Sequence, residues 1–199
     1  MCIRDSFSDG GPGCRWVGNE HGFAGATNWS FLRAGEVYPG YPKYRELQYG
    51  HADGNLWVAA ECDVSIRPGW FYHPEEDDRV KTVDELTDLY YRSVGHNATL
   101  LLNFPVDRDG LIHPTDSANA VNFHQNVQKQ LAHNLLAGLS PKASDERGRT
   151  FSAKAVTDGD YDTYWATNDD VTSATIEFDL PQAEKINRMM LQEYIPLGQ

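Results

Sequence analysis

The sequence RWVGNEHG, residues 15–22, contains a short β-prone run that stops at Gly18 and is followed at once by the carboxylate of Glu20. Strands of a parallel barrel present functional side chains in the loops at their carboxyl ends. We therefore interpret Trp16 and Val17 as the end of a strand and Glu20 as the leading candidate for a catalytic residue. The alternative is a surface glutamate after an edge strand, since most glutamates are solvated.

A second strand is predicted over residues 56–66, LWVAAECDVSI, where polar and apolar side chains alternate toward the carboxyl end. The alternation places Glu61 and Asp63 on the same face, which therefore points into polar surroundings. Each carboxylate is a candidate to orient Glu20 or to contact a ligand. The structural alternative is a buried ion pair with Arg67.

Helical and strand patterns alternate in the next part of the chain. Thr82 and Glu85 have the spacing of a capping box, which predicts a helix that stops at Gly95. A continuous apolar run over residues 99–104 predicts a strand buried on both faces, and a last helix is predicted over 117–136. The order of strand, long loop, strand, helix and strand predicts an α/β fold. The positions expected to face the core are Val83, Leu86, Tyr90 and Val94 in the first helix and Val121, Val127, Leu131 and Leu135 in the second.

The composition changes after Gly138, and the remaining residues form short alternating segments separated by Asp, Asn and Pro clusters. Residues 175–180 and 186–193 are predicted strands of a β-sandwich. This part is too short for a complete sandwich, so we predict two domains, 1–138 and a truncated 139–199. We expect both ends of the chain to be truncations of a longer protein.

Charge and hydropathy exclude several classes of partner. The net charge is −12, and the 17 Lys and Arg residues form no run or stripe, so nucleic acid is an unfavourable partner. No apolar run approaches the roughly 20 residues that cross a bilayer, and no signal-peptide pattern is visible. Five Trp and ten Tyr, many beside short polar residues, suit sugar recognition, although ordinary core and loop aromatics give the same composition. Three cysteines have no metal-ligand spacing.

Long motifs carry a family resemblance. The segments FSDGGPGCRWVGNE (7–20) and GHNATLLLNFPVDRDGLIHPTD (95–116) resemble the C-terminal portion of glycoside hydrolase family 29, the α-L-fucosidases, and most resemble its α-1,3/1,4-preferring branch. The resemblance implies the C-terminal part of a (β/α)8-like barrel followed by an all-β sandwich of jelly-roll type. It also implies a retaining hydrolase of terminal α-L-fucose in which Glu20 is the general acid/base. The family's Asp nucleophile belongs to an earlier strand, and no segment here matches it, so the fragment itself is expected to be inactive.

The same resemblance implies a sugar site and no cofactor for catalysis. From the residues themselves, Trp70 stands just past the end of the second predicted strand, where an aromatic ring can stack on a sugar; plain packing is the alternative. The other candidate substrate-binding residues are His51, Asp53, Glu61 and Arg15. The expected partners are fucosylated glycans, with no nucleic acid and no membrane span, and the full-length parent is expected to be periplasmic or secreted. A lectin-like protein without catalysis and a glycosidase for a different sugar remain as alternatives.

The segment FSAKAVTDGDYDTYWATNDDVTSATIEFDL, residues 151–180, is similar to discoidin-type (coagulation factor 5/8 C-terminal) carbohydrate-binding modules. In such modules an Asp-rich turn binds a structural Ca²⁺ through oxygen ligands, which Asp158, Asp160 and Thr163 would partly supply. An Asp-rich turn without a metal is the alternative.

Overall fold

The computed structural model of the 199-residue chain describes residues 7–8 and 13–194. The chain divides into two compact units, Met1–Gln130 and Leu131–Gly198. The division follows the end of a long helix and so falls earlier than the boundary expected at residue 138. Within the described ranges, no helix combines the length and the apolar character that a membrane crossing requires.

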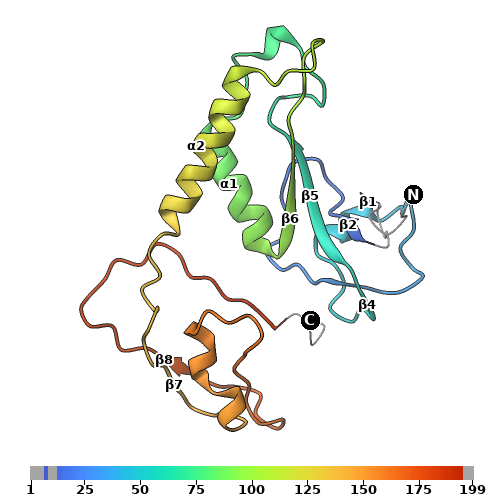
Figure 1. Cartoon of the computed structure of the whole chain (residues 1–199). Coiled ribbons are helices and arrows are strands. Elements are labelled where there is room, and N and C mark those ends of the chain that lie inside the picture. The colour runs from blue at the N-terminus through green and yellow to red at the C-terminus, as the bar shows by residue number, and fades with distance from the viewer. Residues whose placement is uncertain (1–6, 9–12, 195–199) are drawn as a thin grey trace. The chain divides into compact units, whose positions relative to one another are not determined.

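A four-stranded parallel sheet forms the centre of the first unit, with the order β1-β2-β5-β6 (Figure 1). Its register aligns Trp16 of β2 with Glu61 of β5, and Ser65 of β5 with Asn103 of β6. Because all pairs are parallel, the carboxyl ends of the strands meet at one edge. The strands are β1 Phe7–Ser8, β2 Cys14–Trp16, β5 Ala59–Ser65 and β6 Ala98–Asn103.

The long segment between β2 and β5 contains little regular structure. The antiparallel strands β3 Phe31–Leu32 and β4 Leu56–Trp57 pair with each other, and a 3₁₀ helix spans Tyr44–Gln48. The strand predicted over 56–66 is therefore divided into β4 and β5. A small core of Leu32, Tyr41, Leu47 and Val58 packs this segment together.

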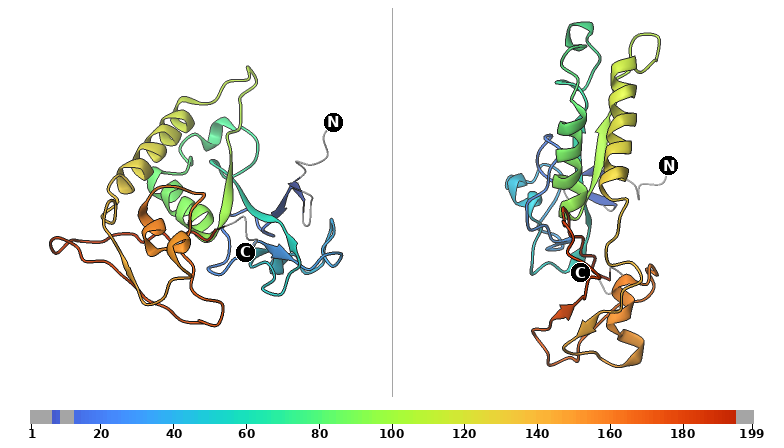
Figure 2. Two further views of the ribbon diagram at one scale, coloured as in Figure 1. Left: turned by 60° about the horizontal axis from the view of Figure 1, so that its bottom comes forward. Right: turned by 90° about the vertical axis from the view of Figure 1, so that its left-hand side faces the viewer.

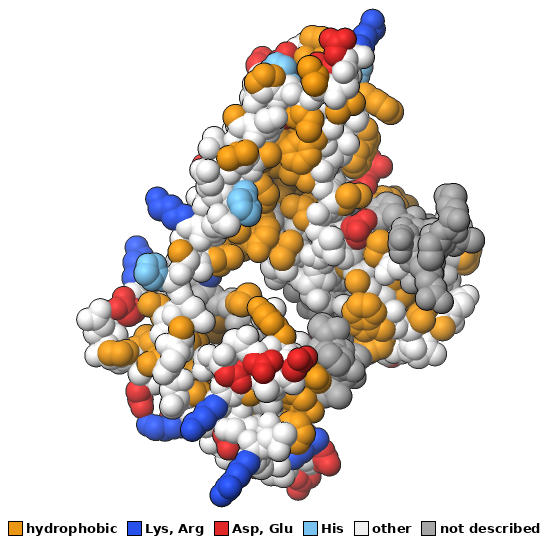
Figure 3. All heavy atoms as spheres, viewed as in Figure 1, with side chains coloured by type: hydrophobic (Ala, Val, Ile, Leu, Met, Phe, Trp, Pro, Cys, Tyr) orange, Lys and Arg blue, Asp and Glu red, His pale blue; other side chains and the backbone are white. Residues whose placement is uncertain are grey.

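Helices α1 (Val83–Ser93) and α2 (Pro114–Gln130) lie side by side on one face of the sheet (Figures 1 and 2). The core beneath α1 contains fully buried Ile66 and Leu86, together with Leu89 and Val64. Figure 3 shows hydrophobic side chains gathered between α2 and β6 on the visible face. The strand pattern at 99–104 was expected to be buried on both faces, but Leu101 of β6 is 46% exposed. Leu100 and Leu102 pack against the core beneath α1, and Leu101 points to the opposite face of the sheet. Short 3₁₀ helices span Pro74–Glu76 and Val94–His96.

The predicted start of α1 is confirmed and its predicted buried stripe is partly wrong. Thr82 is the N-cap, and the capping box with Glu85 is complete. Leu86 is buried as expected, but Val94 is 41% exposed, because the helix ends at Ser93 and the chain turns into a 3₁₀ helix. The chain then reverses at Asn97, which has a φ of 58°, rather than at Gly95.

The second helix begins and ends earlier than predicted. It starts at Pro114, so Asp116 lies inside its first turn, and it ends at Gln130. After it, the Asn134 side chain accepts a hydrogen bond from the backbone of Leu136 at 3.0 Å, a local bond that competes with helix continuation. Of the four positions expected in the core only Val127 is buried. The other three are exposed, namely Val121, Leu131 and Leu135.

The second unit contains β7 Lys142–Ala143 paired antiparallel with β8 Ile176–Glu177, and 3₁₀ helices at Arg149–Phe151 and Ala153–Thr157. The strand predicted over 175–180 is present only as β8. No strand forms over 186–193 within the residues described up to 194. The complete sandwich is therefore not formed by the described residues.

The capping box of α1 yields a stability prediction. Thr82 Oγ1 accepts a hydrogen bond from the Glu85 amide at 3.3 Å, and Glu85 Oε2 accepts from the Thr82 amide at 2.7 Å. We expect Thr82→Ala to lower the free energy of unfolding by about 1 kcal/mol, because it leaves the Glu85 amide without its side-chain acceptor. Urea unfolding followed by circular dichroism measures this. An unchanged midpoint would contradict the capping role.

The same box makes stability depend on pH. Donation from Thr82 lowers the pKa of the Glu85 carboxyl below its ordinary value. The resulting stabilisation is complete above the ordinary glutamate pKa and is lost as the pH falls through the lowered value.

Candidate active site at the carboxyl edge of the sheet

The loop that carries Glu20 leaves β2 through Gly18. Gly18 has a φ of +76°, and a Cβ built there would overlap the carbonyl oxygen of Tyr44. Only glycine fits that backbone position. The loop is closed by Asn19, whose Oδ1 accepts from the His21 amide at 3.0 Å and whose Nδ2 donates to the Phe23 carbonyl at 3.0 Å. The strand-to-loop turn predicted from RWVGNEHG is confirmed, and it leaves the Glu20 side chain exposed.

Glu20 is held by the half-buried Trp70, which follows β5. The indole Nε1 of Trp70 donates to Oε2 of Glu20 at 3.0 Å. Two residues that the sequence singled out at separate strand ends are therefore in contact. The exposed carboxylate keeps its other oxygen free of any described hydrogen bond, so the group remains accessible to a ligand.

Asp63 lies beneath this pair and is almost completely buried. The indole Nε1 of Trp16 donates to its Oδ1 at 2.7 Å. Burial raises the pKa of the Asp63 carboxyl, and the negative charge of Glu20 adds to that shift while the Trp16 bond opposes it. Glu20 and Asp63 therefore interact electrostatically, as their places at the ends of β2 and β5 predict.

Glu61 lies two residues before Asp63 on the same face of β5. Burial raises the pKa of the neighbouring Cys14 thiol, and the negative charge of Glu61 adds to that shift. Cys14 and Cys62 are free, and burial raises the pKa of the Cys62 thiol to about 12. Cys62 is a buried core side chain, whereas Cys14 is partly exposed, and Cys2 lies outside the described residues. Neither Glu61 nor Asp63 pairs with Arg67, so that structural alternative is wrong.

Arg15 lies in the interior of the first unit and bonds to protein groups. Its side chain is completely buried, and its guanidinium donates to the carbonyl oxygens of Leu47 and Val58 at 3.0 Å each and to the Asn28 side chain. Because these acceptors are neutral, burial lowers the Arg15 pKa to about 10. The geometry assigns Arg15 to holding the long segment after β2 rather than to an exposed ligand surface.

His51 and Asp53 lie in that long segment, each with a protein partner. His51 is buried, and its Nδ1 accepts the Arg33 amide at 3.1 Å. Asp53 is exposed and forms an ion pair with the Arg33 side chain at 2.9 Å. No described hydrogen bond or ion pair joins either residue to Glu20 or Trp70.

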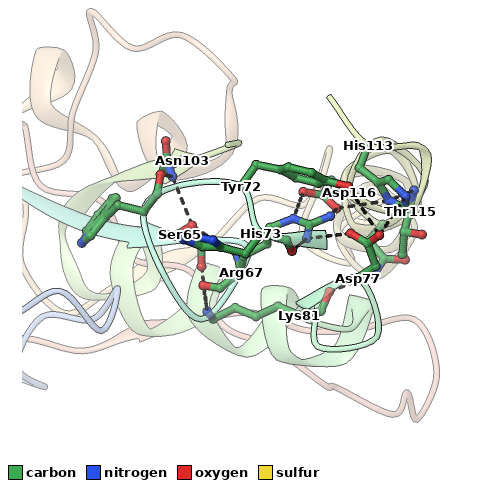
Figure 4. A network of polar contacts seen from close by, with 12 residues as sticks. Ser65, Arg67, Tyr72, His73, Asp77, Lys81, Asn103, His113, Thr115 and Asp116 are labelled. Carbon is green, nitrogen blue, oxygen red and sulfur yellow. Dashed lines mark hydrogen bonds and ion pairs between the residues drawn. The ribbon is translucent and has the colours of Figure 1, made fainter. Parts of the chain in front are cut away.

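A buried ion pair fixes the segment after β5 to the start of α2 (Figure 4). Arg67 donates from Nε and Nη2 to the two oxygens of Asp116 at 2.8 and 2.9 Å, and both side chains are completely buried. Arg67 also pairs with Asp77 at 2.9 Å and lies over the Tyr72 ring, 4.6 Å from its centroid. The acidic partners raise the Arg67 pKa above its ordinary value. This bidentate arrangement makes the backbone that precedes Trp70 rigid.

Asn103, the last residue of β6, is a site residue that the sequence analysis did not single out. Its Nδ2 donates to Ser65 Oγ and to the backbone oxygen of Trp70, at 3.1 Å each. The available signal was a single amide residue at the end of the apolar run TLLLN, at the same edge as Glu20.

The Asp158 turn of the second unit is closed by its own hydrogen bonds. Asp158 accepts from the Asp160 amide at 2.9 Å and from the Thr163 hydroxyl at 2.7 Å, which lowers the Asp158 pKa. No group of three or more His, Cys, Asp or Glu side chains in the described part of the chain has metal-binding geometry. The oxygens of the turn are already used internally, so calcium binding there stays a prediction.

A parallel sheet with an exposed, indole-held carboxylate beyond its strand ends is the arrangement of α/β enzymes whose sites lie at the carboxyl edge. The chain is similar to curated proteins named as α-L-fucosidases. It is 40% identical to an alpha-L-fucosidase 1 homologue of Oryza sativa subsp. japonica over 199 residues and 36% identical to alpha-L-fucosidase 1 of Arabidopsis thaliana over 201 residues. Each alignment covers 97% of this chain, which spans 38% of the length of each relative. No protein-family model matches the chain.

Solved structures described as α-L-fucosidases or as glycoside hydrolase family 29 enzymes are similar in fold. An α-L-fucosidase homologue of Bacteroides thetaiotaomicron is 45% identical with a TM-score of 0.79, over 85% of this chain and 37% of that one. A family 29 fucosidase of Ruminococcus gnavus, solved in complex with fucose, is 34% identical with a TM-score of 0.74, over 84% of this chain and 34% of that one. The homologues of this chain are thus α-L-fucosidases, and they are considerably longer.

Proposed function

We propose that this chain is the C-terminal part of the catalytic barrel of a retaining α-L-fucosidase that removes terminal α-L-fucose from glycans. The observation that carries the proposal is the exposed Glu20, held by Trp70 at the carboxyl edge of a parallel sheet. Similarity to family 29 fucosidases, one of them solved with fucose, supports the choice of sugar. The α-1,3/1,4 linkage preference rests on the sequence motifs.

The proposed chemistry is a double displacement. An Asp from an earlier part of the full-length protein attacks the anomeric carbon, the bond from that carbon to the leaving oxygen breaks, and its electron pair stays on that oxygen. Protonated Glu20 donates its proton there. Glu20 then removes a proton from the water that releases fucose, and the two carboxyl groups should be about 5–5.5 Å apart.

The substrate roles follow from exposure. Trp70 presents its ring beside Glu20 and is proposed to stack on the sugar. Asp53 is exposed and is proposed, with Glu61, to contact the glycan, whereas buried His51 and Arg15 act by supporting the long segment. The second unit is proposed to be the start of a discoidin-type module with a structural Ca²⁺ at Asp158, and the parent to be periplasmic or secreted.

A panel of nitrophenyl glycosides tests the proposed sugar specificity. We expect the full-length protein to hydrolyse the α-L-fucoside at least about tenfold faster than the other glycosides, because a pocket that hydrogen-bonds substrate hydroxyls rejects mismatched sugars. The 199-residue chain alone should give no turnover, because it lacks the nucleophile. A faster rate on another glycoside would contradict the proposed fucosidase activity. Turnover by the 199-residue chain alone would contradict the proposal that the nucleophile lies in an earlier part of the protein.

A further inference from the structure

Asn103 ties the loop that follows β5 to the end of β6 at two points. Its backbone oxygen accepts from the Ile66 amide at 3.0 Å, and its Nδ2 donates to the backbone oxygen of Trp70 at 3.1 Å. A single residue therefore fixes both the beginning of the loop and the residue whose side chain reaches Glu20. Figure 4 shows Asn103 beside Ser65, on the side of the network away from the Arg67 ion pair.

A second hydrogen bond connects Trp70 to the carboxyl group of Glu20. Trp70 is held through its backbone by Asn103 and holds Glu20 through its indole, at 3.0 Å. Asn103 itself makes no described contact with Glu20. Glu20 is exposed on a loop, and Trp70 is the only described side chain that forms a hydrogen bond with it. Movement of Trp70 therefore changes where the carboxyl group lies.

We propose that Asn103 is a positioning residue for Glu20, acting through Trp70, so that the proton of Glu20 is delivered along the line of the breaking glycosidic bond. The inference rests on the proposed function. General acid catalysis contributes about 10²–10⁴-fold to rate, and a displacement of about 1 Å can remove about 10²-fold. A small movement of Trp70 is therefore enough to affect proton transfer.

Asn103→Asp is the informative variant because it keeps the shape of the side chain and removes the donor. Ser65 Oγ can turn and donate to the new carboxylate, but the carbonyl oxygen of Trp70 then faces an acceptor. Asn119→Asp is the matched control, since Asn119 Nδ2 donates to the backbone oxygen of Lys81 at 2.9 Å with no described bond to Glu20 or Trp70. Asn103→Leu serves as the uncharged counterpart if the Asp variant unfolds.

The experiment measures kcat/KM of the full-length protein on two fucosides that differ in leaving-group acidity. For Asn103→Asp we expect a loss of at most about 2-fold on 2-chloro-4-nitrophenyl α-L-fucoside and of about 10–100-fold on phenyl α-L-fucoside, since only the poor leaving group needs a proton. Asn119→Asp should leave the ratio of the two values unchanged. An equal loss on both substrates would show that Asn103 is merely structural and overturn the inference.

Trp70→Phe tests whether the effect of Asn103 reaches Glu20 through the indole. It removes the indole donor and should give the same dependence on leaving group, and adding Asn103→Asp to it should cause little further change in that ratio. Additive losses would overturn the route through Trp70. If Glu20→Ala itself lacks the dependence, the proposed function fails; if Glu20→Ala has it and Asn103→Asp does not, only the positioning role fails.

Discussion

Glu20→Ala should lower kcat/KM of the full-length protein on phenyl α-L-fucoside by about 10²–10⁴-fold, the usual contribution of a general acid. On 2-chloro-4-nitrophenyl α-L-fucoside the first step should be nearly unaffected, and release of fucose should become slow because no base activates water. Azide needs no base and should restore turnover. Two successive inversions, one by the protein and one by azide, should give α-L-fucosyl azide, which nuclear magnetic resonance identifies.

The control for this variant is Glu75→Ala. Glu75 also follows β5, but its side chain is 76% exposed and its described ionic partner is His73 at 4.0 Å. We expect normal kinetics and no effect of azide. Near-normal activity of Glu20→Ala without azide rescue would remove Glu20 from the acid/base role, whereas a β-configured azide product would identify Glu20 as the nucleophile instead.

Arg67→Met should lower the free energy of unfolding by about 3–5 kcal/mol, because it leaves the buried carboxylate of Asp116 without its bidentate partner. The urea-unfolding midpoint of the chain, followed by tryptophan fluorescence, measures the loss. The double variant Arg67→Met/Asp116→Leu should recover most of it, since the fully buried carboxylate is then gone and the carboxylate of Asp77, which is 35% exposed, reaches water. Failure of this recovery would show that the cost comes from lost packing.

An exposed arginine pair provides the comparison. The distance between Arg33 and Asp53 is 2.9 Å, similar to that between Arg67 and Asp116, but the two side chains are 43% and 68% exposed. Water solvates both charges in the absence of the pair, so Arg33→Met should change the midpoint much less than Arg67→Met. Equal effects would contradict burial as the origin of the difference.

The elements predicted well are those determined by neighbouring residues. The capping box joins Thr82 to Glu85, only three positions further along the chain. The turn at Gly18 depends on a single residue that tolerates a positive φ. Both signals can therefore be found in a short stretch of sequence. The buried faces were predicted less well. Leu131 and Leu135 continue the apolar pattern of α2, but the helix stops before them. Asn134 then forms a local turn bond, which hydrophobic periodicity does not detect.

The same distinction applies to the site. Glu20 and Trp70 were identified because each follows a strand end, and parallel pairing brings those ends to one edge. The pairing of Arg67 with Asp116 spans 49 residues, and the sequence offers several other carboxylates as equally good partners. Hydrophobic periodicity places elements, but it does not select one acid among many.

The buried position of Arg15 has a consequence for the order of folding. Its guanidinium is satisfied only when the carbonyl groups of Leu47 and Val58, 32 and 43 residues away, are already in place. Closing such a segment costs chain entropy before any bond forms, whereas α1 needs only local contacts. We therefore expect the helices to form early and the turn that presents Glu20 to become native late, together with the collapse of the segment around Arg15.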